Sequence, residues 1–250
     1  TVPPRRRGPG PMTNPGGTSP DFHFPVRVRE GRCGDWSIEC REISPTDAKQ
    51  INAWHEYQHG ERFARTLDIA PGRYWVLKCG ADTLWMSNTQ METRTALGFV
   101  RAARGRVLVS GLGLGMIVDA LLAKPEVTGI TVLERSPEVI TLVGPLYGDE
   151  PRVRIILADV FEWTPPAGET WDWAWHDIWA TIDPENFRQM DALKERFRPF
   201  AAQQRCWAAA LVRQQMLDLG EDPFRARAEA QKDLMERSKD LNETPDGLRL

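Results

Sequence analysis

The sequence has few cysteines, no cysteine motif and no long apolar run. Its four cysteines are scattered without a C-x-x-C pair, so neither a zinc knuckle nor a disulfide framework is indicated, and we expect reduced thiols and no metal site. No apolar run approaches the roughly 18 to 20 residues that a transmembrane helix needs. The Arg-rich and Pro-rich first residues also lack the apolar core of a secretory signal. We therefore expect a cytoplasmic protein that makes no membrane contact.

The chain has little net charge. A formal charge of -3 over 250 residues gives no general electrostatic reason to bind nucleic acid. The composition, 41% apolar and 27% charged, is that of an ordinary globular protein with enough residues for a sizeable core. We expect a small-molecule substrate as the partner, and a homodimer remains open as the assembly state.

Composition divides the chain into four regions. The first is rich in arginine, proline and glycine and has almost no apolar periodicity, so it is predicted to be a disordered tail. The second alternates short strand-like segments with one helix that opens at Ser44-Pro45 and stops near Gly60. The third alternates strand-like and helix-like segments, and the last is predicted to be a charged helical tail. The predicted boundaries are 1–25, 26–87, 88–220 and 221–250.

The third region alternates strands and helices. Strands are predicted at Val107–Val109, Gly129–Leu133, Val153–Leu157 and Trp173–Ile178, with helices between the first three. Such alternation predicts an α/β fold, a Rossmann-like doubly wound and mostly parallel sheet with helices on both faces. After the fourth strand the pattern shows helices and no clear further strand. We therefore expect a sheet that is abbreviated at this point, preceded by the small β-rich lead-in.

A glycine-rich turn follows the first of these strands. Gly111, Gly113 and Gly115 stand where a strand passes into a helix, and glycine there lets a ligand approach the backbone closely. Glu134 ends the next strand, where its two oxygens can accept both hydroxyls of a ribose. The G-x-G-x-G spacing disfavours NAD, because Met116 takes the place of the third small residue. The alternative is that the turn only packs a helix on a strand.

Two further strand ends carry carboxylates. Asp159 and Val160 follow the third strand, where a carboxylate can receive an adenine amino group and Phe161 can cover the ring. His176 and Asp177 end the fourth. Open α/β sheets bind ligands at this edge, so we expect an adenosine-containing ligand there.

At these residues the chain resembles the class I S-adenosylmethionine-dependent methyltransferases, and within them the spermidine-synthase-like branch. The resemblance covers about Leu84 to Phe200 and rests on four motifs in the family's order, at 107–115, 131–140, 151–163 and 171–177. It implies S-adenosylmethionine as cofactor and a transferase activity. It also implies that the three glycines line the methionine and ribose side, that Glu134 holds the ribose, and that Asp159, with Val160 beside it, holds the adenine.

The fourth strand end is the predicted catalytic position. The resemblance matches Asp177 to the carboxylate that polyamine synthases use near the attacking amine. Asp177 can orient or deprotonate a nucleophile, with His176 as the alternative base. Strand alternation puts the two on opposite faces, and His176 packed among tryptophans is an equal alternative. Trp179, just beyond the strand, is the predicted wall of the substrate pocket.

The acceptor class is left open by the sequence. Met86 to Glu92 stands where aminopropyl transferases carry a Tyr-His-Glu element, so a diamine substrate is not supported. Our prediction is a methyltransferase acting on a small molecule. The alternatives are a spermidine-synthase-like aminopropyl transferase and a non-catalytic nucleoside-binding module on the same fold.

A separate motif, His55-Glu56-Tyr57-Gln58-His59, matches the H-E-x-x-H pattern of zinc hydrolases. Gly60 ends the predicted helix at the second histidine, polar residues follow, and no third ligand is evident. A hydrated helix with adjacent polar side chains explains the motif better than a metal site.

Overall fold

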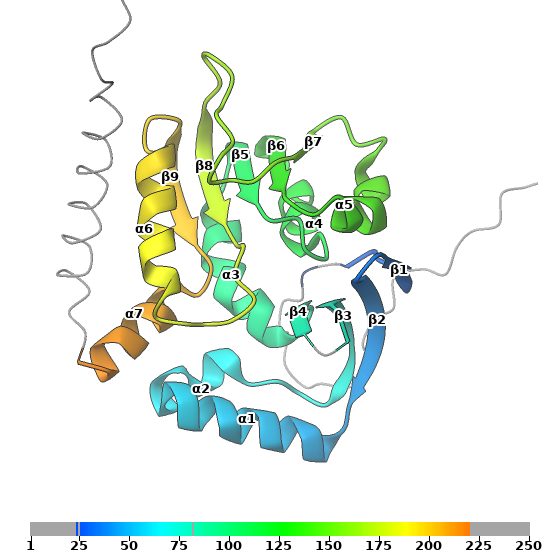
Figure 1. Cartoon of the computed structure of the whole chain (residues 1–250), viewed down its shortest axis with the longest axis vertical. Helices are drawn as coiled ribbons and strands as arrows, with labels where there is room; N and C mark the ends of the chain where they lie inside the picture. The colour runs from blue at the N-terminus through cyan, green and yellow to red at the C-terminus, as the bar shows by residue number, and fades with distance from the viewer. Residues whose placement is uncertain (1–23, 25, 82, 221–250) are drawn as a thin grey trace, which may run out of the picture.

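The computed structural model describes residues 24, 26–81 and 83–220 (Figure 1). The predicted C-terminal tail, 221–250, lies outside the described residues, as does the predicted N-terminal tail apart from Phe24. Phe24 is buried in the hydrophobic core.

A five-stranded parallel sheet forms the centre of the α/β fold. Its strand order is β7-β6-β5-β8-β9, and each pair of neighbours runs parallel. The order reverses between β5 and β8, which is the switch point where open α/β sheets form a crevice. The strands are β5 (Gly105–Ser110), β6 (Val127–Glu134), β7 (Val153–Leu157), β8 (Trp171–His176) and β9 (Ala201–Cys206).

Helices cover both faces of this sheet. Trp175 and His176 point to opposite faces because side chains alternate along a strand. Trp175 stacks on Phe99 of α3, with ring centroids 4.8 Å apart, whereas His176 lies against Phe197 of α6 at 5.4 Å. The elements in this region are α3 (Gln90–Ala102), α4 (Met116–Leu122), α5 (Pro137–Val143), the 3-10 helix η1 (Gly144–Tyr147), α6 (Asn186–Phe197) and α7 (Ala209–Asp218).

A second, antiparallel sheet forms the lead-in. Its order is β1-β2-β3-β4, with strands β1 (Gly31–Cys33), β2 (Trp36–Ile43), β3 (Gly72–Cys79) and β4 (Thr83–Ser87). Between β2 and β3 lie α1 (Pro45–His59) and α2 (Glu61–Leu67). Ser44 caps α1 through a reciprocal capping box with Asp47, and Gly60 ends it, as the sequence predicted. Figure 1 shows the arrowhead of β8 pointing toward the side on which this small sheet lies.

The prediction that the parallel sheet has no strand after the fourth is wrong. A fifth parallel strand, β9, follows α6 and pairs with β8. Its sequence, Ala-Ala-Gln-Gln-Arg-Cys, has exposed residues at three of its six positions because β9 borders solvent at the sheet edge. The polar composition therefore hid the strand from hydrophobic periodicity. Strand β8 also begins at Trp171 and ends at His176, two residues earlier than predicted.

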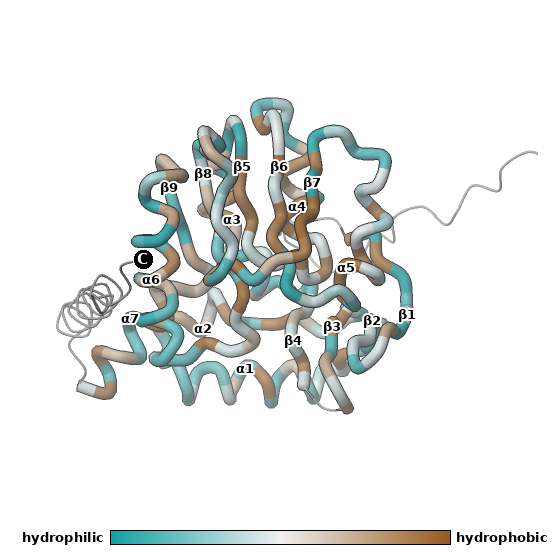
Figure 2. The backbone as a smooth tube through the Cα atoms, turned by 45° about the horizontal axis from the view of Figure 1, so that its top comes forward, coloured by the Kyte–Doolittle hydropathy of each residue, from teal (hydrophilic) through white to brown (hydrophobic). Residues whose placement is uncertain are grey.

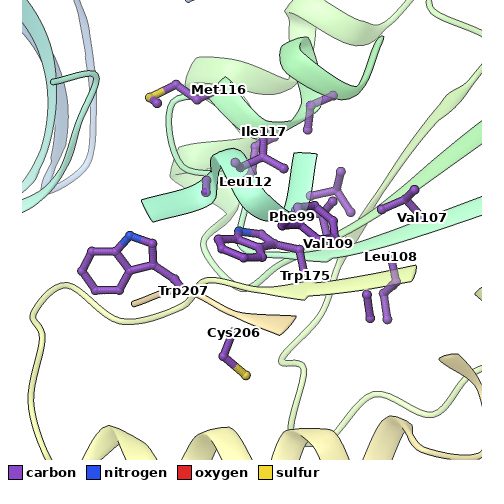
Figure 3. Close-up of a cluster of buried hydrophobic side chains, with 14 of the residues drawn as sticks. Phe99, Val107, Leu108, Val109, Leu112, Met116, Ile117, Trp175, Cys206 and Trp207 are labelled. Atoms are coloured by element: carbon purple, nitrogen blue, oxygen red, sulfur yellow. The ribbon is translucent and has the colours of Figure 1, made fainter. Parts of the chain in front are cut away.

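The core lies between the parallel sheet and its helices. Figure 2 shows hydrophobic stretches along β5, β6 and α4, while α1 is mostly hydrophilic. Figure 3 shows Phe99 and Trp175 side by side in this core, with Trp207 nearby. Strands β5 and β8 are almost continuously buried, which is the pattern of central parallel strands and fixes their carboxyl ends firmly.

Candidate functional site

A cavity of about 310 Å³ opens at the carboxyl edge of the parallel sheet. The turn after β5 and the ends of β6, β7 and β8 form one side of it. Trp36, Trp85 and Met86 of the small sheet contribute the other. The cavity therefore lies where the two sheets meet, at the switch point of the strand order.

The glycine turn needs glycine because neighbouring parts of the protein approach it. A Cβ on Gly111, whose φ is +95°, would lie 2.1 Å from the Asp177 carbonyl oxygen. A Cβ on Gly113 would lie 2.4 Å from Met86 Sδ. Both glycines line the cavity, whereas Gly115 is not among the lining residues and packs against Tyr147 at the start of α4.

Glu134 holds the glycine turn as well as lining the cavity. Its Oε2 accepts a hydrogen bond from the Leu112 N–H at 2.8 Å, and its Oε1 accepts one from the Ser136 N–H at 2.8 Å. A carboxylate has about four acceptor sites, so each oxygen keeps capacity for another donor. The residue that the sequence assigned to a ligand thus also fixes two backbone segments.

The end of β7 supplies the next part of the wall. Asp159 Oδ1 accepts from the Phe161 N–H at 2.8 Å, and Asp159 Oδ2 lies 3.9 Å from the Arg135 guanidinium. Val160 lines the cavity beside Asp159, and Phe161 is partly exposed there. The structure therefore brings Gly111, Glu134 and Asp159 to one cavity.

Asp177 lies at the β8 end of the same cavity. Its Oδ2 accepts from Trp175 Nε1 at 3.3 Å. Burial raises the pKa of Asp177 from 3.8 to about 7. A carboxyl group with such a pKa can exchange a proton near neutral pH, which is what a general base requires.

Glu92 is a lining residue that the sequence analysis did not single out. It is 8% exposed, and its Oε2 accepts from Trp207 Nε1 at 3.1 Å. Burial and, to a lesser degree, the charge of Asp177 raise its pKa to about 8. Glu92 falls on the same helical stripe as Ala96 and Phe99, so an acidic residue on an apolar stripe was the available signal.

His176 is not among the residues that line the cavity. Its side chain is fully buried on the α6 face, where Nδ1 pairs with Ser110 Oγ at 2.9 Å and Nε2 with Gln204 Oε1 at 3.1 Å. Burial lowers its pKa to about 4, so the ring is neutral at pH 7. Both nitrogens are satisfied within the protein.

Trp179 forms part of the wall next to Asp177. Its Nε1 donates to Gln189 Oε1 of α6 at 2.7 Å, which fixes the ring against the cavity. Trp207, which follows β9, lines the same end. The β8 end therefore combines two carboxylates with two indole rings.

The H-E-x-x-H histidines bind other parts of the protein. His55 Nδ1 contacts the Leu67 carbonyl oxygen at 2.9 Å, and His59 Nδ1 contacts Gln215 Nε2 of α7 at 3.1 Å. Their rings lie 6.3 Å apart. Within the part of the chain that the structure describes, no three histidine, cysteine or acidic side chains group as metal ligands. These imidazoles hold α1 against its neighbours.

Comparison with known proteins gives only partial likenesses. No family model matches the chain, and no curated protein matches it. Among solved structures, the plantazolicin methyltransferase BpumL in complex with S-adenosylhomocysteine is 17% identical, with a TM-score of 0.31 over 44% of this chain and 39% of that one. The N-methyltransferase NodS from Bradyrhizobium japonicum, also with S-adenosylhomocysteine, is 16% identical, with a TM-score of 0.34 over 43% of this chain and 52% of that one.

A third solved structure is that of an enzyme named for an RNA substrate. The 23S rRNA methyltransferase ErmE is 20% identical, with a TM-score of 0.29 over 34% of this chain and 35% of that one. All three likenesses span less than two thirds of the solved chains. The fold assignment therefore rests on the strand order and the parallel pairing. Among the described residues, no helix is both long and apolar enough to cross a membrane.

Proposed function

We propose that the protein is an S-adenosylmethionine-dependent methyltransferase that acts on a small-molecule acceptor. The observation that supports this most is the placement of Gly111, Glu134, Asp159 and Asp177 around one cavity at the switch point of the sheet. The spare acceptor capacity of Glu134 suits the two ribose hydroxyls, and Asp159 suits the adenine amino group. The residues present thus fit the cofactor that the sequence resemblance implies.

The β8 end of the cavity carries the proposed chemistry. When bound, S-adenosylmethionine supplies an electrophilic methyl group on a positively charged sulfur. Asp177 orients the acceptor and takes its proton, since its raised pKa lets it bind a proton near neutral pH. His176, the alternative base, has its ring on the other face of β8, where Ser110 and Gln204 pair with its two nitrogens.

The spermidine-synthase-like alternative uses the same cavity with an aminopropyl donor. The pair of carboxylates at the β8 end supports this alternative, because acidic side chains can bind an amine substrate. Mass spectrometry of the product separates the two reactions, because a methyl and an aminopropyl group add different masses.

Asp177→Asn tests the proposed function. Asparagine keeps the size of the side chain but cannot take a proton. We expect turnover to fall about 10²- to 10⁴-fold while the dissociation constant of S-adenosylhomocysteine stays within about threefold of wild type. Normal turnover by the variant would assign Asp177 to structure. Binding of S-adenosylmethionine without transfer to any compound in a broad acceptor screen would favour the non-catalytic module.

A further inference from the structure

Glu92 and Asp177 reach the β8 end of the cavity from two different elements. Glu92 comes from the first turn of α3, and Asp177 follows β8. Trp175, which precedes Asp177 by two residues, faces α3 through Phe99, so Asp177 emerges on the α3 side of the sheet. Both residues line this part of the cavity, next to Trp179 and Trp207.

Neutral donors orient both carboxylates. Trp207 Nε1 donates to Glu92, and Trp175 Nε1 donates to Asp177. No lysine, arginine or histidine in the described part of the chain forms an ion pair with either one, and Asp177 Oδ1 accepts no hydrogen bond from the described residues. An indole N–H is not a counter-ion, so ionisation of either carboxyl group leaves a negative charge that no cation among the described residues neutralises.

The remaining charges of the cavity lie at its other end. Glu134 ends β6 and Asp159 follows β7, and Arg135, the one cation among the described lining residues, lies 3.9 Å from Asp159. Glu134 is already engaged by two backbone N–H groups. Among the described residues, the β8 end thus holds two carboxyl groups and no cation, and Trp179 and Trp207 enclose it. Carboxyl groups buried in this way stay protonated near neutral pH, as their raised pKa values indicate, unless a cationic partner stabilises the ionised form.

We propose that the end of the cavity formed by Glu92, Asp177, Trp179 and Trp207 selects an acceptor that carries a protonated amine, with Glu92 as the specificity-determining residue. An ammonium group provides the missing charge and three N–H donors, and the indole faces favour a cation further. This inference rests on the proposed function, since it names the acceptor class of that site. Glu92 acts in recognition, and Asp177 keeps the role of base.

Matched probes test the proposal by varying only the charge of the functional group. The full-length protein, saturated with S-adenosylhomocysteine, is titrated calorimetrically with benzylamine, benzyl alcohol and benzoate, and with the corresponding phenethyl series. We expect the amines to bind about 10-fold or more tightly than the alcohols, and benzoate not to bind. Glu92→Gln keeps an acceptor for Trp207 and removes the charge. It should reduce the preference for amines to threefold or less.

Glu195→Gln is the matched control, because Glu195 is an exposed carboxylate of α6 that pairs with Arg198. This variant should keep the full preference. Alcohols that bind as well as amines, a preference that survives in Glu92→Gln, or the absence of amine binding would each overturn the proposal. The affinity for S-adenosylhomocysteine is measured in the same samples. Absence of S-adenosylhomocysteine binding would contradict the proposed function. Measurable binding of S-adenosylhomocysteine without a preference for amines would contradict only this inference.

Discussion

Asp177 and His176 are neighbours in sequence with opposite surroundings. His176 lies in the core on the α6 face, where Ser110 and Gln204 satisfy both ring nitrogens. Asp177 lies in the cavity wall, where burial raises its pKa. The period of two along a strand produces this separation, so His176, the last residue of β8, packs in the core while Asp177 lines the cavity.

Glu134 combines an observed structural role with the proposed contact to the ribose, and its substitution should affect both. Glu134→Ala removes the acceptor of two backbone N–H groups and of the proposed ribose hydroxyls. We expect the affinity for S-adenosylmethionine to fall about 30- to 1000-fold. The free energy of unfolding should fall by about 1 to 3 kcal/mol. Calorimetry and thermal denaturation measure the two effects.

Glu162→Ala is the control for Glu134, because Glu162 is an exposed carboxylate close to Asp159 in sequence. It should change neither the affinity nor the stability. If Glu134→Ala stays folded and binds S-adenosylmethionine as tightly as wild type does, the cofactor assignment is wrong.

The two cavity carboxylates should make stability depend on pH. Their folded-state pKa values, about 8 for Glu92 and about 7 for Asp177, exceed their ordinary values of 4.5 and 3.8. Between pH 7 and 8 the folded state therefore binds more protons than the unfolded state. Stability contributed by these protonated groups is lost as the pH rises, by about 1 to 2 kcal/mol per pH unit for the two groups together.

The double variant Glu92→Gln/Asp177→Asn tests this dependence. Denaturant unfolding at pH 7.0, 7.5 and 8.0 should show a decline for wild type and a flatter profile for the variant. The comparison cancels the contribution of His55, His59 and His176, whose lowered pKa values act in the opposite direction. Parallel profiles in the two proteins would show that these carboxyl groups are ionised throughout.

At the scale of elements, the turn between β5 and α4 depends on one close backbone contact. Gly111→Ala would place a Cβ 2.1 Å from a backbone carbonyl oxygen at a positive φ, so relief requires movement of the β8 end. We expect a loss of about 2 kcal/mol or more in unfolding free energy. Gly129→Ala in β6 is the control, since nothing lies within 4 Å of its Cβ position. Equal stability of the two variants in denaturant unfolding would contradict this account of the turn.

Sequence patterns predicted the elements whose burial follows a simple period. The bounds of β7 agree with the predicted strand at 153–157, and α1 starts and stops at its predicted signals. Strand β9 was missed because its exposed positions carry polar residues, and α2 because it follows Gly60 directly. Local sequence patterns predict one element at a time, so they do not reveal an edge strand that forms through pairing with a neighbouring strand.

Local sequence patterns also predicted only part of the candidate site. Glu134, Asp159 and Asp177 stand at strand ends, and strand ends of a parallel sheet meet at one edge. Glu92 reaches the cavity because α3 packs beside it, and Trp207 reaches it because it follows β9. Neither α3 nor β9 was predicted to contribute to the site. Only tertiary structure shows that these two residues are hydrogen-bonded across 115 positions of sequence.

At the scale of the whole molecule, the two sheets create the site together. The parallel sheet provides the glycine turn and the carboxylates, and the small sheet closes the cavity with Trp36, Trp85 and Met86. The Leu114 N–H donates to Met86 Sδ at 3.4 Å, which links β4 to the glycine turn. The lead-in thus contributes to the site as well as to the core.

Calorimetric titration of the full chain with S-adenosylhomocysteine tests the central claim most directly, because it needs no acceptor. The account predicts one site per chain with a dissociation constant of about 100 μM or tighter, competition by S-adenosylmethionine, and weak or no binding of NAD. Decarboxylated S-adenosylmethionine in the same series reports whether the methionine carboxylate is recognised. Absence of binding by the folded wild-type protein, or a preference for NAD, would contradict the account.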